Sequence, residues 1–355
     1  MITIQKTDFL NGIKAVKTST AKVGLQPILA CMRIKCVGQA LELTATDLNS
    51  SARTIIEANI DTPIDVCVNA DKLENIVARL GDIIKIDLKD AFLEIKSGKT
   101  RFNCLTLNTV DFPEVSFDIE GEKISLPMID FVDGINKTIF ATSADIINVL
   151  NGVCFTFGTN GYELAATDGN RLCQVKFEGS VGKEGQFVIP RKTLLDVIRI
   201  NGQELKICLN EKDVVFQIGS SFFKTRVINS QFPKYQALIP QNQPQNATIK
   251  RNELVKALEK VAIMCDEKTG ITVFNFNENT LNIVTSCDNG NAEDNLEIWF
   301  EGELKIAFNY KYLLEGIKAM TTEDVTFGMN GALGACVVKG DNNYLSLIMP
   351  VQIRN

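Results

Sequence analysis

The chain has 355 residues, of which 45% are hydrophobic and 23% charged, and its formal net charge is −6. These values are typical of a globular protein with two to four domains, each able to bury its own core. Histidine is absent, which removes the commonest general base and the commonest metal ligand. The composition therefore argues against most enzymes that depend on histidine.

Two further features bear on the compartment. No apolar run approaches the roughly 18 residues that span a bilayer, and the start MITIQKTDFL lacks the pattern of a signal peptide. The ten cysteines are scattered, without a CxxC pair, and many stand among Val, Leu, Phe and Ile. Such cysteines act as small core hydrophobes rather than as a disulfide framework. We expect a cytoplasmic protein with reduced thiols.

The predicted elements of the first third follow the order helix, strands, helix, strands. Apolar residues recur with helical spacing in two segments, and the strands alternate apolar and polar residues. In chain order, the predicted ranges are a helix over 7–19, strands over 32–47 and 51–60, a helix over 68–80, and strands over 82–98 and 100–107. This order predicts an α+β unit with hairpin-connected antiparallel sheets.

The other two thirds repeat this order. The middle third has predicted helices over 129–141 and 189–200, followed by strands over 204–220 and 222–229. The last third has predicted helices over 252–264 and 308–320. A polar linker rich in Gln, Asn and Pro, residues 240–248, separates these two thirds, and a shorter linker spans residues 115–125.

Matching residues recur about every 120 positions. Asp47, Asp168 and Asp288 follow strand-like runs and are 121 and 120 residues apart. Phe-Pro pairs at 112–113 and 232–233 are 120 apart, and the last third ends near Met349-Pro350. A period of this length fits a complete small domain. We therefore expect three similar domains, with boundaries at 1–120, 121–244 and 245–355.

The motifs of common enzymes are missing. The sequence has no GxxxxGK[ST] phosphate loop, no GxGxxG before a helix and no dense carboxylate motif for a metal. An enzyme acting on nucleotides through Asp168 and Arg171 would need a metal or a carboxylate pair, which the sequence does not offer. We expect no catalytic residue, no metal and no cofactor.

Cations recur on the predicted helices although the protein is acidic. Each second helix carries two of them seven residues apart, and hence on one face. A solvated surface helix is the simplest explanation for any one pair, but the repetition in all three thirds favours a surface for phosphates, which are bound without regard to sequence. The candidate DNA-facing residues are Lys14, Lys17, Lys22, Lys72, Arg79, Lys137, Lys192, Arg199, Lys256, Lys260, Lys311 and Lys318.

Over its whole length the chain resembles the bacterial DNA polymerase III beta subunits, the sliding clamps. The order and spacing of several short motifs carry the resemblance. These are LQPIL from Leu25, ATD from Ala45, DFP from Asp111, LNG from Leu150, ATDGNRL from Ala166, IPRK from Ile189, FPKY from Phe232, FNYKYLL from Phe308 and IMPV from Ile348. The threefold repeat strengthens this identification.

The resemblance implies a DNA sliding clamp, a processivity factor rather than an enzyme. Two chains would form a head-to-tail homodimer whose six domains close into a ring, with sheets outside and helices facing the DNA. The segments implied at the dimer interface are residues 100–107 and 269–276 and the helix end at 263–264. The residues concerned are Phe102, Cys104, Leu105, Ile263, Met264, Thr272 and Phe274.

The resemblance also implies partners that bind through short peptide motifs: DNA polymerase III, clamp-loader subunits, other polymerases and repair proteins. Their peptides would occupy an apolar pocket between the second and third domains. The implied pocket residues are Leu150, Thr167, Gly169, Asn170, Arg171, Leu172, Pro233, Leu238, Asn309, Tyr312, Leu333, Ile348, Met349, Pro350 and Val351. From the residues alone, ATDGNR is better explained as a turn that uses Asp-Gly, followed by a buried strand.

Some positions depart from the family pattern. Relatives often carry His at the Asn170 position, a basic residue near Ala237, Arg at Gln352, and aromatic residues where this chain has Asn148 and Val149. Different polar preferences of the pocket are expected from these departures. A clamp-like scaffold paralogue that does not support replication stays open as an alternative.

Overall fold

We describe residues 1–22, 26–145, 149–179, 181–182 and 184–352 of a computed structural model of the chain. Leu25 and Asn148, which were named above, lie outside these ranges. The chain forms two compact units: residues 1–131 with 192–227, and residues 132–191 with 228–355. Within the described ranges, every helix falls short of the length and hydropathy that a membrane-spanning segment requires.

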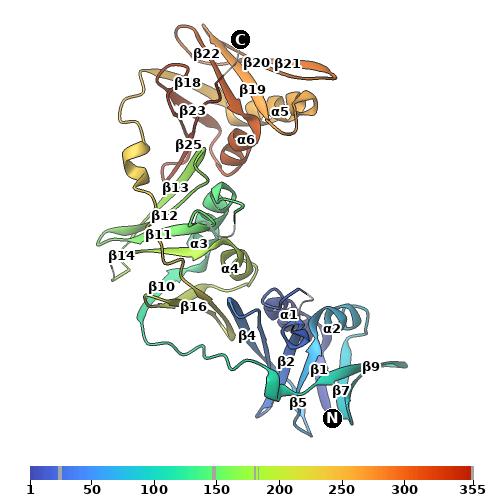
Figure 1. The fold of residues 1–355 in the computed structure, drawn as a ribbon. Helices are drawn as coiled ribbons and strands as arrows, with labels where there is room; N and C mark the ends of the chain where they lie inside the picture. Colours follow the sequence, from blue (N-terminus) through green and yellow to red (C-terminus); the bar gives the residue numbers. More distant parts are fainter. Residues whose placement is uncertain (23–25, 146–148, 180, 183, 353–355) are drawn as a thin grey trace. The chain divides into compact units, whose positions relative to one another are not determined.

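Unit 1, residues 1–131 with 192–227, is built on one antiparallel sheet (Figure 1). The strand order is β10-β15-β16-β17-β4-β3-β2-β6-β9-β8-β7-β1-β5. The strands are β1 Ile2–Gln5, β2 Cys31–Val37, β3 Ala40–Thr46, β4 Ser50–Glu57, β5 Asn59–Ile60, β6 Asp65–Asn69, β7 Ile83–Lys89, β8 Phe92–Ser97, β9 Thr100–Leu107, β10 Glu122–Pro127, β15 Glu204–Leu209, β16 Asp213–Ile218 and β17 Ser221–Arg226. The helices are α1 Lys6–Lys17, α2 Ala70–Val77 and most of α4 Arg191–Val197, with short 3-10 turns at Pro27–Ala30 and Thr109–Asp111.

Unit 2, residues 132–191 with 228–355, contains two antiparallel sheets. Their strand orders are β14-β11-β12-β13-β25-β24-β23-β18 and β21-β20-β19-β22. The strands are β11 Gly152–Phe157, β12 Gly161–Thr167, β13 Arg171–Glu178, β14 Gly185–Pro190, β18 Gln245–Lys250, β19 Ile271–Asn277, β20 Thr280–Cys287, β21 Gly290–Glu297, β22 Leu304–Asn309, β23 Asp324–Met329, β24 Cys336–Lys339 and β25 Tyr344–Ile348. Helices α5 Arg251–Val261 and α6 Tyr310–Lys318 and most of α3 Met128–Thr138 belong to this unit, with 3-10 turns at Ile139–Ala141, Tyr235–Leu238 and Ala262–Met264.

The first helix of each repeat packs closely on a sheet because it carries a small residue at its centre. In α1, a Cβ on Gly12 would lie 2.6 Å from Cδ1 of Ile56 on β4. In α3, a Cβ on Gly134 would lie 3.0 Å from Leu164 and Phe177. Ala257 takes this place in α5 and is fully buried. Larger residues here would push the helix off the sheet, so the repeat preserves a packing distance.

Two of the second helices begin at an asparagine that caps them. The Asn69 side chain accepts a hydrogen bond from the N–H of Lys72, and the Asn309 side chain accepts one from the N–H of Lys311. Such caps satisfy N–H groups that the first helical turn leaves unpaired. The structure confirms the six predicted helices, each within a few residues of its predicted range. It also confirms the antiparallel sheets.

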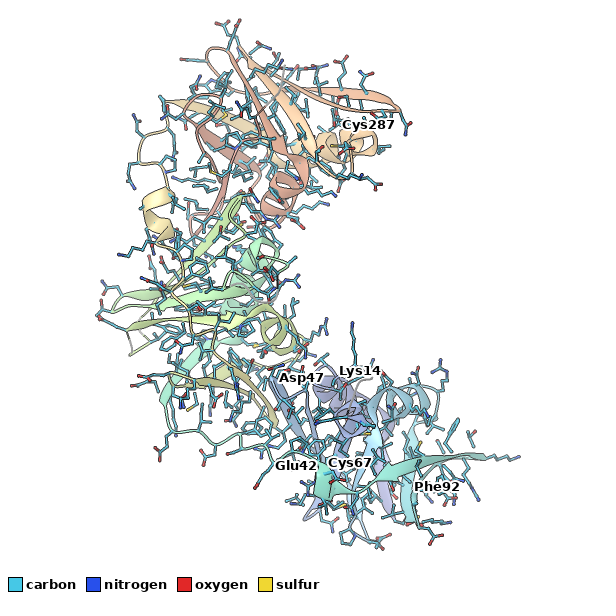
Figure 2. The ribbon with its side chains drawn as sticks, in the orientation of Figure 1. Lys14, Glu42, Asp47, Cys67, Phe92 and Cys287 are labelled. Carbon is cyan, nitrogen blue, oxygen red and sulfur yellow. The ribbon has the colours of Figure 1, made fainter. Side chains whose placement is uncertain are left out.

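The strand registers correct one landmark of the repeat. Thr46, Thr167 and Ser286 each lie three residues after a fully buried apolar side chain, namely Leu43, Leu164 and Ile283, and each is paired across the matching turn. In the third repeat the ladder continues through one more pair, Cys287↔Gly290. The next residues are therefore equivalent, namely Asp47, Asp168 and Cys287. Asp288, which the sequence pattern matched to Asp47 and Asp168, lies one residue beyond that equivalent position when the residues are counted from the buried side chains. Asp47 and Cys287 are both labelled in Figure 2.

Candidate functional site

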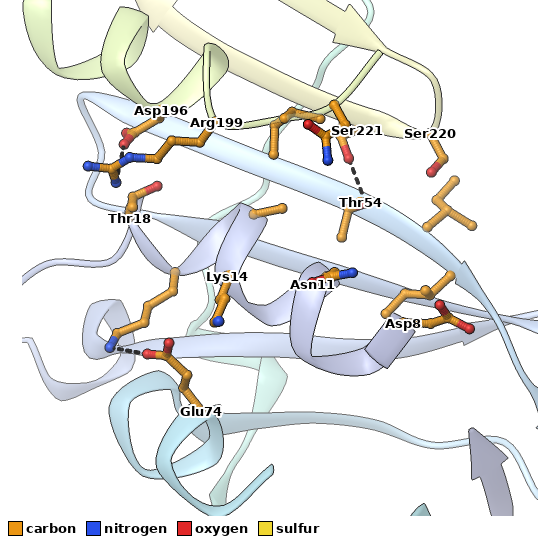
Figure 3. Close-up of a pocket in the computed structure, with 17 residues that line it drawn as sticks. Asp8, Asn11, Lys14, Thr18, Thr54, Glu74, Asp196, Arg199, Ser220 and Ser221 are labelled. Atoms are coloured by element: carbon orange, nitrogen blue, oxygen red, sulfur yellow. Dashed lines mark hydrogen bonds and ion pairs between the residues drawn. The ribbon is translucent and has the colours of Figure 1, made fainter. Parts of the chain in front are cut away.

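In unit 1, the strand after the Asp47 turn joins the last strand of the next repeat. Strand β4 pairs with β17 in the register Ala52↔Phe223, Arg53↔Phe222 and Thr54↔Ser221. The hydroxyls of Thr54 and Ser221 are 2.8 Å apart, an interaction that Figure 3 shows. We call this pairing the first junction. It makes one continuous sheet from two repeats.

The same construction recurs in unit 2, where we call it the second junction. Strand β13, which follows the Asp168 turn, pairs with β25 in the register Arg171↔Ile348, Cys173↔Ser346 and Gln174↔Leu345. The N–H of Met349 continues the ladder by donating to the carbonyl of Asn170 at 2.9 Å. Two of the three repeats in the chain are thus joined onward by equivalent strands.

The third copy of this strand has no such partner within the described residues. Strand β21, the equivalent of β4 and β13, is an edge strand that pairs with β20 on one side. The last strand of the first repeat, β9, pairs with β8 along its length, but reaches β6 only at Thr106 and Leu107. Edges of this kind are available for another chain.

The two open edges carry opposite charge. Near β9, Glu94 is surrounded by Lys89, Lys96 and Arg101, and hydrogen bonds from Lys89 and Lys96 lower the pKa of Glu94 to about 2. Three cations around one carboxylate leave a positive excess. Strand β21 instead carries Glu293, Asp294 and Glu297. The edges are therefore complementary.

Each junction turn is fixed by charged side chains. At the first junction, the Asp47 carboxylate accepts hydrogen bonds from the N–H groups of Asn49 and Ser50, at 3.0 and 2.6 Å. Lys192, from the start of α4, forms an ion pair with Asp47 and donates to the Ser50 hydroxyl at 3.1 Å. This lysine is therefore engaged with the turn, although half of its side chain stays exposed.

At the second junction the central group is Arg171, which is 8% exposed. Its guanidinium forms an ion pair with Asp168 at 2.9 Å and another with Glu315 on α6, and it lies 4.4 Å from the centre of the Tyr312 ring. It also donates to the carbonyl of Phe140. Burial alone would lower the pKa of Arg171, but Glu315 and Asp168 raise it above its ordinary value. Arg171 thus joins several segments of unit 2. The sequence did not predict that Glu315 and Phe140 belong to this site.

The implied peptide-pocket residues gather around the second junction. Leu150 and Leu172 belong to an apolar cluster with Phe232, Tyr235, Val337 and Leu347. Around this cluster, Leu238, Met349 and Leu333 are 63%, 43% and 71% exposed, which is unusual for large apolar side chains. Pro233 is exposed beside Phe232, Ile348 is fully buried, and the N–H of Val351 donates to the carbonyl of Ala307 at 2.8 Å.

The remaining pocket residues shape the turn and the helix start. The Thr167 hydroxyl donates to the carbonyl of Arg171 and accepts from the N–H of Gly169, whose φ of +94° suits glycine. Asn170 is exposed at the tip. Asn309 caps α6, and its amide donates to the carbonyl of Thr269. Met349 is the first residue after β25, and Pro350 is the second.

Most of the candidate DNA-facing cations are exposed, as Lys14 on α1 illustrates in Figure 2. Many are held by carboxylates: Lys17 by Asp71 and Glu74, Arg199 by Asp196, Lys260 by Asp294, and Lys318 by Glu259. Lys311 donates to the carbonyl of Glu267, and Arg79 to that of Asn75. In the described part of the chain, the exposed ammonium groups of Lys14, Lys22, Lys72 and Lys256 have no ion pair.

Lys137 does not fit the DNA-facing set. It is 6% exposed and lies between Asp133 and Asp341, at 3.0 Å from each. A buried lysine between two carboxylates cannot contact phosphates without breaking both pairs. Its place on the helix suggested an exposed face, whereas Asp341 comes from a distant loop and covers it.

A groove of about 720 Å³ lies beside α1 in unit 1 (Figure 3). Its lining includes Lys14 and Lys17 from α1, Arg199 after α4, and the buried carboxyl of Asp196. Burial raises the pKa of Asp196, against the opposing attraction of Lys192 and Arg199. The lining of this groove therefore combines cations with the carboxylates of Asp8, Glu74 and Asp196.

The implied dimer residues divide into two groups. Leu105 and Ile263 are 60% and 81% exposed, and Met264 lies in the 3-10 turn that contacts β21. Phe102 and Cys104 lie on β9. Thr272 and Phe274, however, are fully buried on β19, which lies between β20 and β22. Their side chains belong to the core of unit 2, so they are not available to a second chain.

The described residues contain no group of three His, Cys, Asp or Glu side chains placed to hold a metal ion. Burial raises the pKa of the thiols of Cys67 and Cys154 to about 12, so these groups stay protonated at neutral pH.

Comparison with known proteins gives consistent matches over the whole chain. Three family models of the DNA polymerase III beta subunit match this chain. The model of the N-terminal domain matches residues 1–116, that of the central domain residues 125–234, and that of the C-terminal domain residues 236–352. The beta sliding clamp of Synechococcus elongatus is 30% identical, over 89% of each chain.

Solved structures agree with this. A DnaN sliding clamp from Bartonella birtlesii, bound to griselimycin, has a TM-score of 0.93 and 26% identity, with 99% of both chains covered. The DNA polymerase III beta subunit of Thermotoga maritima has the same fold, with a TM-score of 0.94, 24% identity and 99% of both chains covered.

Proposed function

The chain belongs to the DNA polymerase III beta subunit family and is a sliding clamp of DNA replication, and we propose that two copies close head to tail around duplex DNA. The observation that carries this proposal is the repeated junction. Each chain makes two junctions internally and leaves the strands of a third, β21 and β9, with open edges. Two chains would supply each other with the missing strand and so complete a ring of six domains.

The internal junctions supply a register for the proposed third one. Strand β21 corresponds to β4 with 240 added to each number, and β9 corresponds to β17 with 121 subtracted. Applied to the first junction, this places Phe102 opposite Ala292 and Arg101 opposite Glu293 of the second copy. Phe102–Ala292 repeats the Phe223–Ala52 pair, and Arg101–Glu293 joins opposite charges on one face. Leu105, Ile263 and Met264 would add apolar contact beside this ladder.

We propose that the exposed helical cations hold the DNA through its phosphates. Such contacts carry affinity but no sequence information, which suits a protein that must slide. The largest contributions would come from the cations that have no ion pair with a carboxylate in the described part of the chain, namely Lys14, Lys22, Lys72, Lys256 and Arg79. A smaller contribution would come from the cations that the chain's own groups engage, namely Lys17, Lys192, Arg199, Lys260, Lys311 and Lys318. Lys137 would contribute nothing directly.

We further propose that partner peptides bind at the second junction. Exposed Leu238, Leu333 and Met349 surround an apolar cluster there, so a partner's apolar side chains would gain burial. Polymerase and clamp-loader subunits and repair proteins are the partners proposed. We also propose domain boundaries at residues 120 and 244, a role without catalysis and a cytoplasmic location. The relatives' names favour replication over a scaffold paralogue.

The sharpest test of this function asks whether the protein encircles DNA. Light scattering should give about twice the 39.2-kDa chain mass. With a matching clamp loader, the protein should stay on nicked circular DNA through gel filtration and should leave when a restriction enzyme linearises that DNA. Equal retention on linear and circular DNA would show ordinary adhesion instead of encirclement. A monomeric mass at micromolar concentration would contradict the ring.

A further inference from the structure

Unit 1 has a second groove, on the side of the sheet crossed by the connector of residues 112–121. Its volume is about 540 Å³, and strands β10, β15, β16 and β17 contribute to its lining. Three hydrogen bonds to carbonyls of the connector fix it to β15, to β17 and to the turn after β15. Lys224 donates to Ser116 at 3.1 Å, the Cys208 thiol to Ile119 at 3.3 Å, and Asn210 to Glu120 at 3.0 Å. The groove is therefore bounded by an anchored segment.

One wall of this groove is aromatic. Phe117 of the connector lies 6.2 Å from Phe222 of β17, centre to centre. The guanidinium of Arg53 lies against both rings, at 4.8 and 4.5 Å from their centres. Arg53 approaches the Glu42 carboxylate only to 3.8 Å. This stack keeps the wall apolar and places a positive charge at its edge.

The groove also has an excess of positive charge. Its lining contains Arg53, Lys123 and Lys206 but only one carboxylate, that of Asp118. Lys123 is exposed and has no ion pair within the described ranges, and Lys206 meets Glu204 only at 3.8 Å, where both side chains are exposed. In a chain whose net charge is −6, three cations beside an apolar wall favour a ligand that is both acidic and apolar.

We propose that this groove binds a short peptide segment of a partner protein, with an aromatic or aliphatic side chain flanked by carboxylates. The apolar side chain would pack on Phe117 and Phe222, while the carboxylates would meet Lys123 and Lys206. The groove's residues all belong to unit 1. It is therefore distinct from the peptide pocket proposed at the second junction, whose residues all belong to unit 2.

The experiment uses the full chain with methyl-labelled isoleucine and the probe peptide acetyl-Glu-Glu-Phe-Glu-Glu-amide. Ile119, Ile124 and Ile207 line the groove, so saturable shifts of their methyl signals are expected. The double variant Lys123→Glu with Lys206→Glu should weaken binding by about tenfold or more, because it reverses the charge that the peptide meets. The control, Lys35→Glu with Lys85→Glu, makes the same charge change at exposed lysines on β2 and β7 and should leave the affinity within about twofold.

Specified results would overturn the proposal. One is an equal loss of affinity in the groove and control variants, which would indicate general attraction to the protein's charge. Another is equal binding of acetyl-Lys-Lys-Phe-Lys-Lys-amide. Full competition by inorganic phosphate or a dinucleotide would make the groove an anion or nucleic-acid site. Shifts confined to Ile348 and Ile239 would place the peptide at the second junction, without bearing on encirclement of DNA.

Discussion

Lys137 and Asp341 form a buried ion pair in which Nζ and Oδ2 are 3.0 Å apart and each side chain is 8% exposed. Although burial alone would lower it, hydrogen bonds to Asp133 and Asp341 raise the pKa of Lys137. Burial likewise opposes the lowering of the pKa of Asp341, which Thr321 and Lys137 bring about. This pair therefore contributes to the folding of unit 2, although the lysine belongs to a repeated set of helical cations.

Lys137→Gln should destabilise the protein by about 3 kcal/mol, because it leaves a buried carboxylate without its cation. The loss should be full at pH 7 and should shrink as the pH falls below the ordinary Asp value of 3.8 towards the lowered pKa of Asp341. Urea unfolding at several pH values measures it. Lys256→Gln, at an exposed position on α5, should change stability by less than about 0.5 kcal/mol. Equal effects of the two variants would contradict a structural role for Lys137.

Asp196→Asn should stabilise the protein at pH 7. Because burial raises the folded-state pKa of Asp196 above that of the unfolded chain, the ionised carboxylate costs stability at neutral pH. That cost disappears as the pH falls through the raised pKa of Asp196. As the pH is lowered from 7, the extra stability of the variant should therefore begin to shrink before the pH reaches the ordinary Asp value of 3.8. Thermal melts at pH 7, 6, 5 and 4 test this, with the exposed Asp61→Asn as control. A destabilised variant at pH 7 would show that the attraction of Lys192 and Arg199 outweighs burial.

Arg101→Glu should weaken the proposed dimer by about tenfold to a hundredfold, because it places two carboxylates opposite each other on β9 and β21. Adding Glu293→Arg should restore most of the affinity by exchanging the charges. Glu297→Arg is the matched control, since it changes the same charge on the same face of β21 four residues away. Sedimentation equilibrium measures the dissociation constant. Rescue by Glu297→Arg and not by Glu293→Arg would show a different register.

Reversing Lys14, Lys72, Arg79 and Lys256 to glutamate should reduce retention on circular DNA by at least about tenfold at 50 mM salt and make it less sensitive to salt. The reason is that each reversal removes a phosphate contact and adds repulsion. Reversal of Lys72, Arg79, Lys192 and Arg199 tests the wider set. A matched quadruple change of strand lysines, at Lys35, Lys85, Lys206 and Lys339, should leave retention nearly unchanged. Equal losses from the helix and strand sets would indicate that only net charge matters.

Met349→Ala or Pro350→Ala should weaken a polymerase C-terminal peptide by about 1–2 kcal/mol, since each removes apolar contact from the surface at the second junction. The dimer mass should not change, because neither residue lies on β9 or β21. Isothermal titration with the peptide provides the affinity, and light scattering provides the mass. Trp299→Ala is a useful control, as it removes another exposed apolar side chain of unit 2. An unchanged affinity in both test variants would refute the pocket assignment.

The sequence allowed the helices and most strands to be predicted because their apolar residues recur with clear periods. Strand β21 escaped, since its sequence GNAEDNLE has little apolar alternation and half-buried side chains alternate with exposed ones. The resemblance instead placed Thr272 and Phe274 of β19 at the interface, although both side chains are fully buried in the core. A strand's own residues indicate its faces; which strand lies beside it depends on pairing over long separations.

The site residues were predictable to a similar extent. Leu150, Leu172 and Met349 could be placed near one another only through the resemblance, because residues from three distant segments meet there. The exposed cations followed from helical spacing. The burial of Lys137 and the binding of Arg171 by Glu315 did not, since each depends on a carboxylate more than 140 residues away.

The compact units and the sequence repeats divide the chain at different residues. The middle repeat contributes residues 192–227 to one unit and residues 132–191 to the other. A fragment ending near residue 120 would therefore lack β15, β16 and β17 and would expose the edge of β4. Such a fragment should be prone to aggregation, whereas each repeat looks independent in the sequence. For proteolysis, truncation or domain exchange, the part of the chain to keep whole is therefore a compact unit, which consists of one end repeat and its share of the middle repeat.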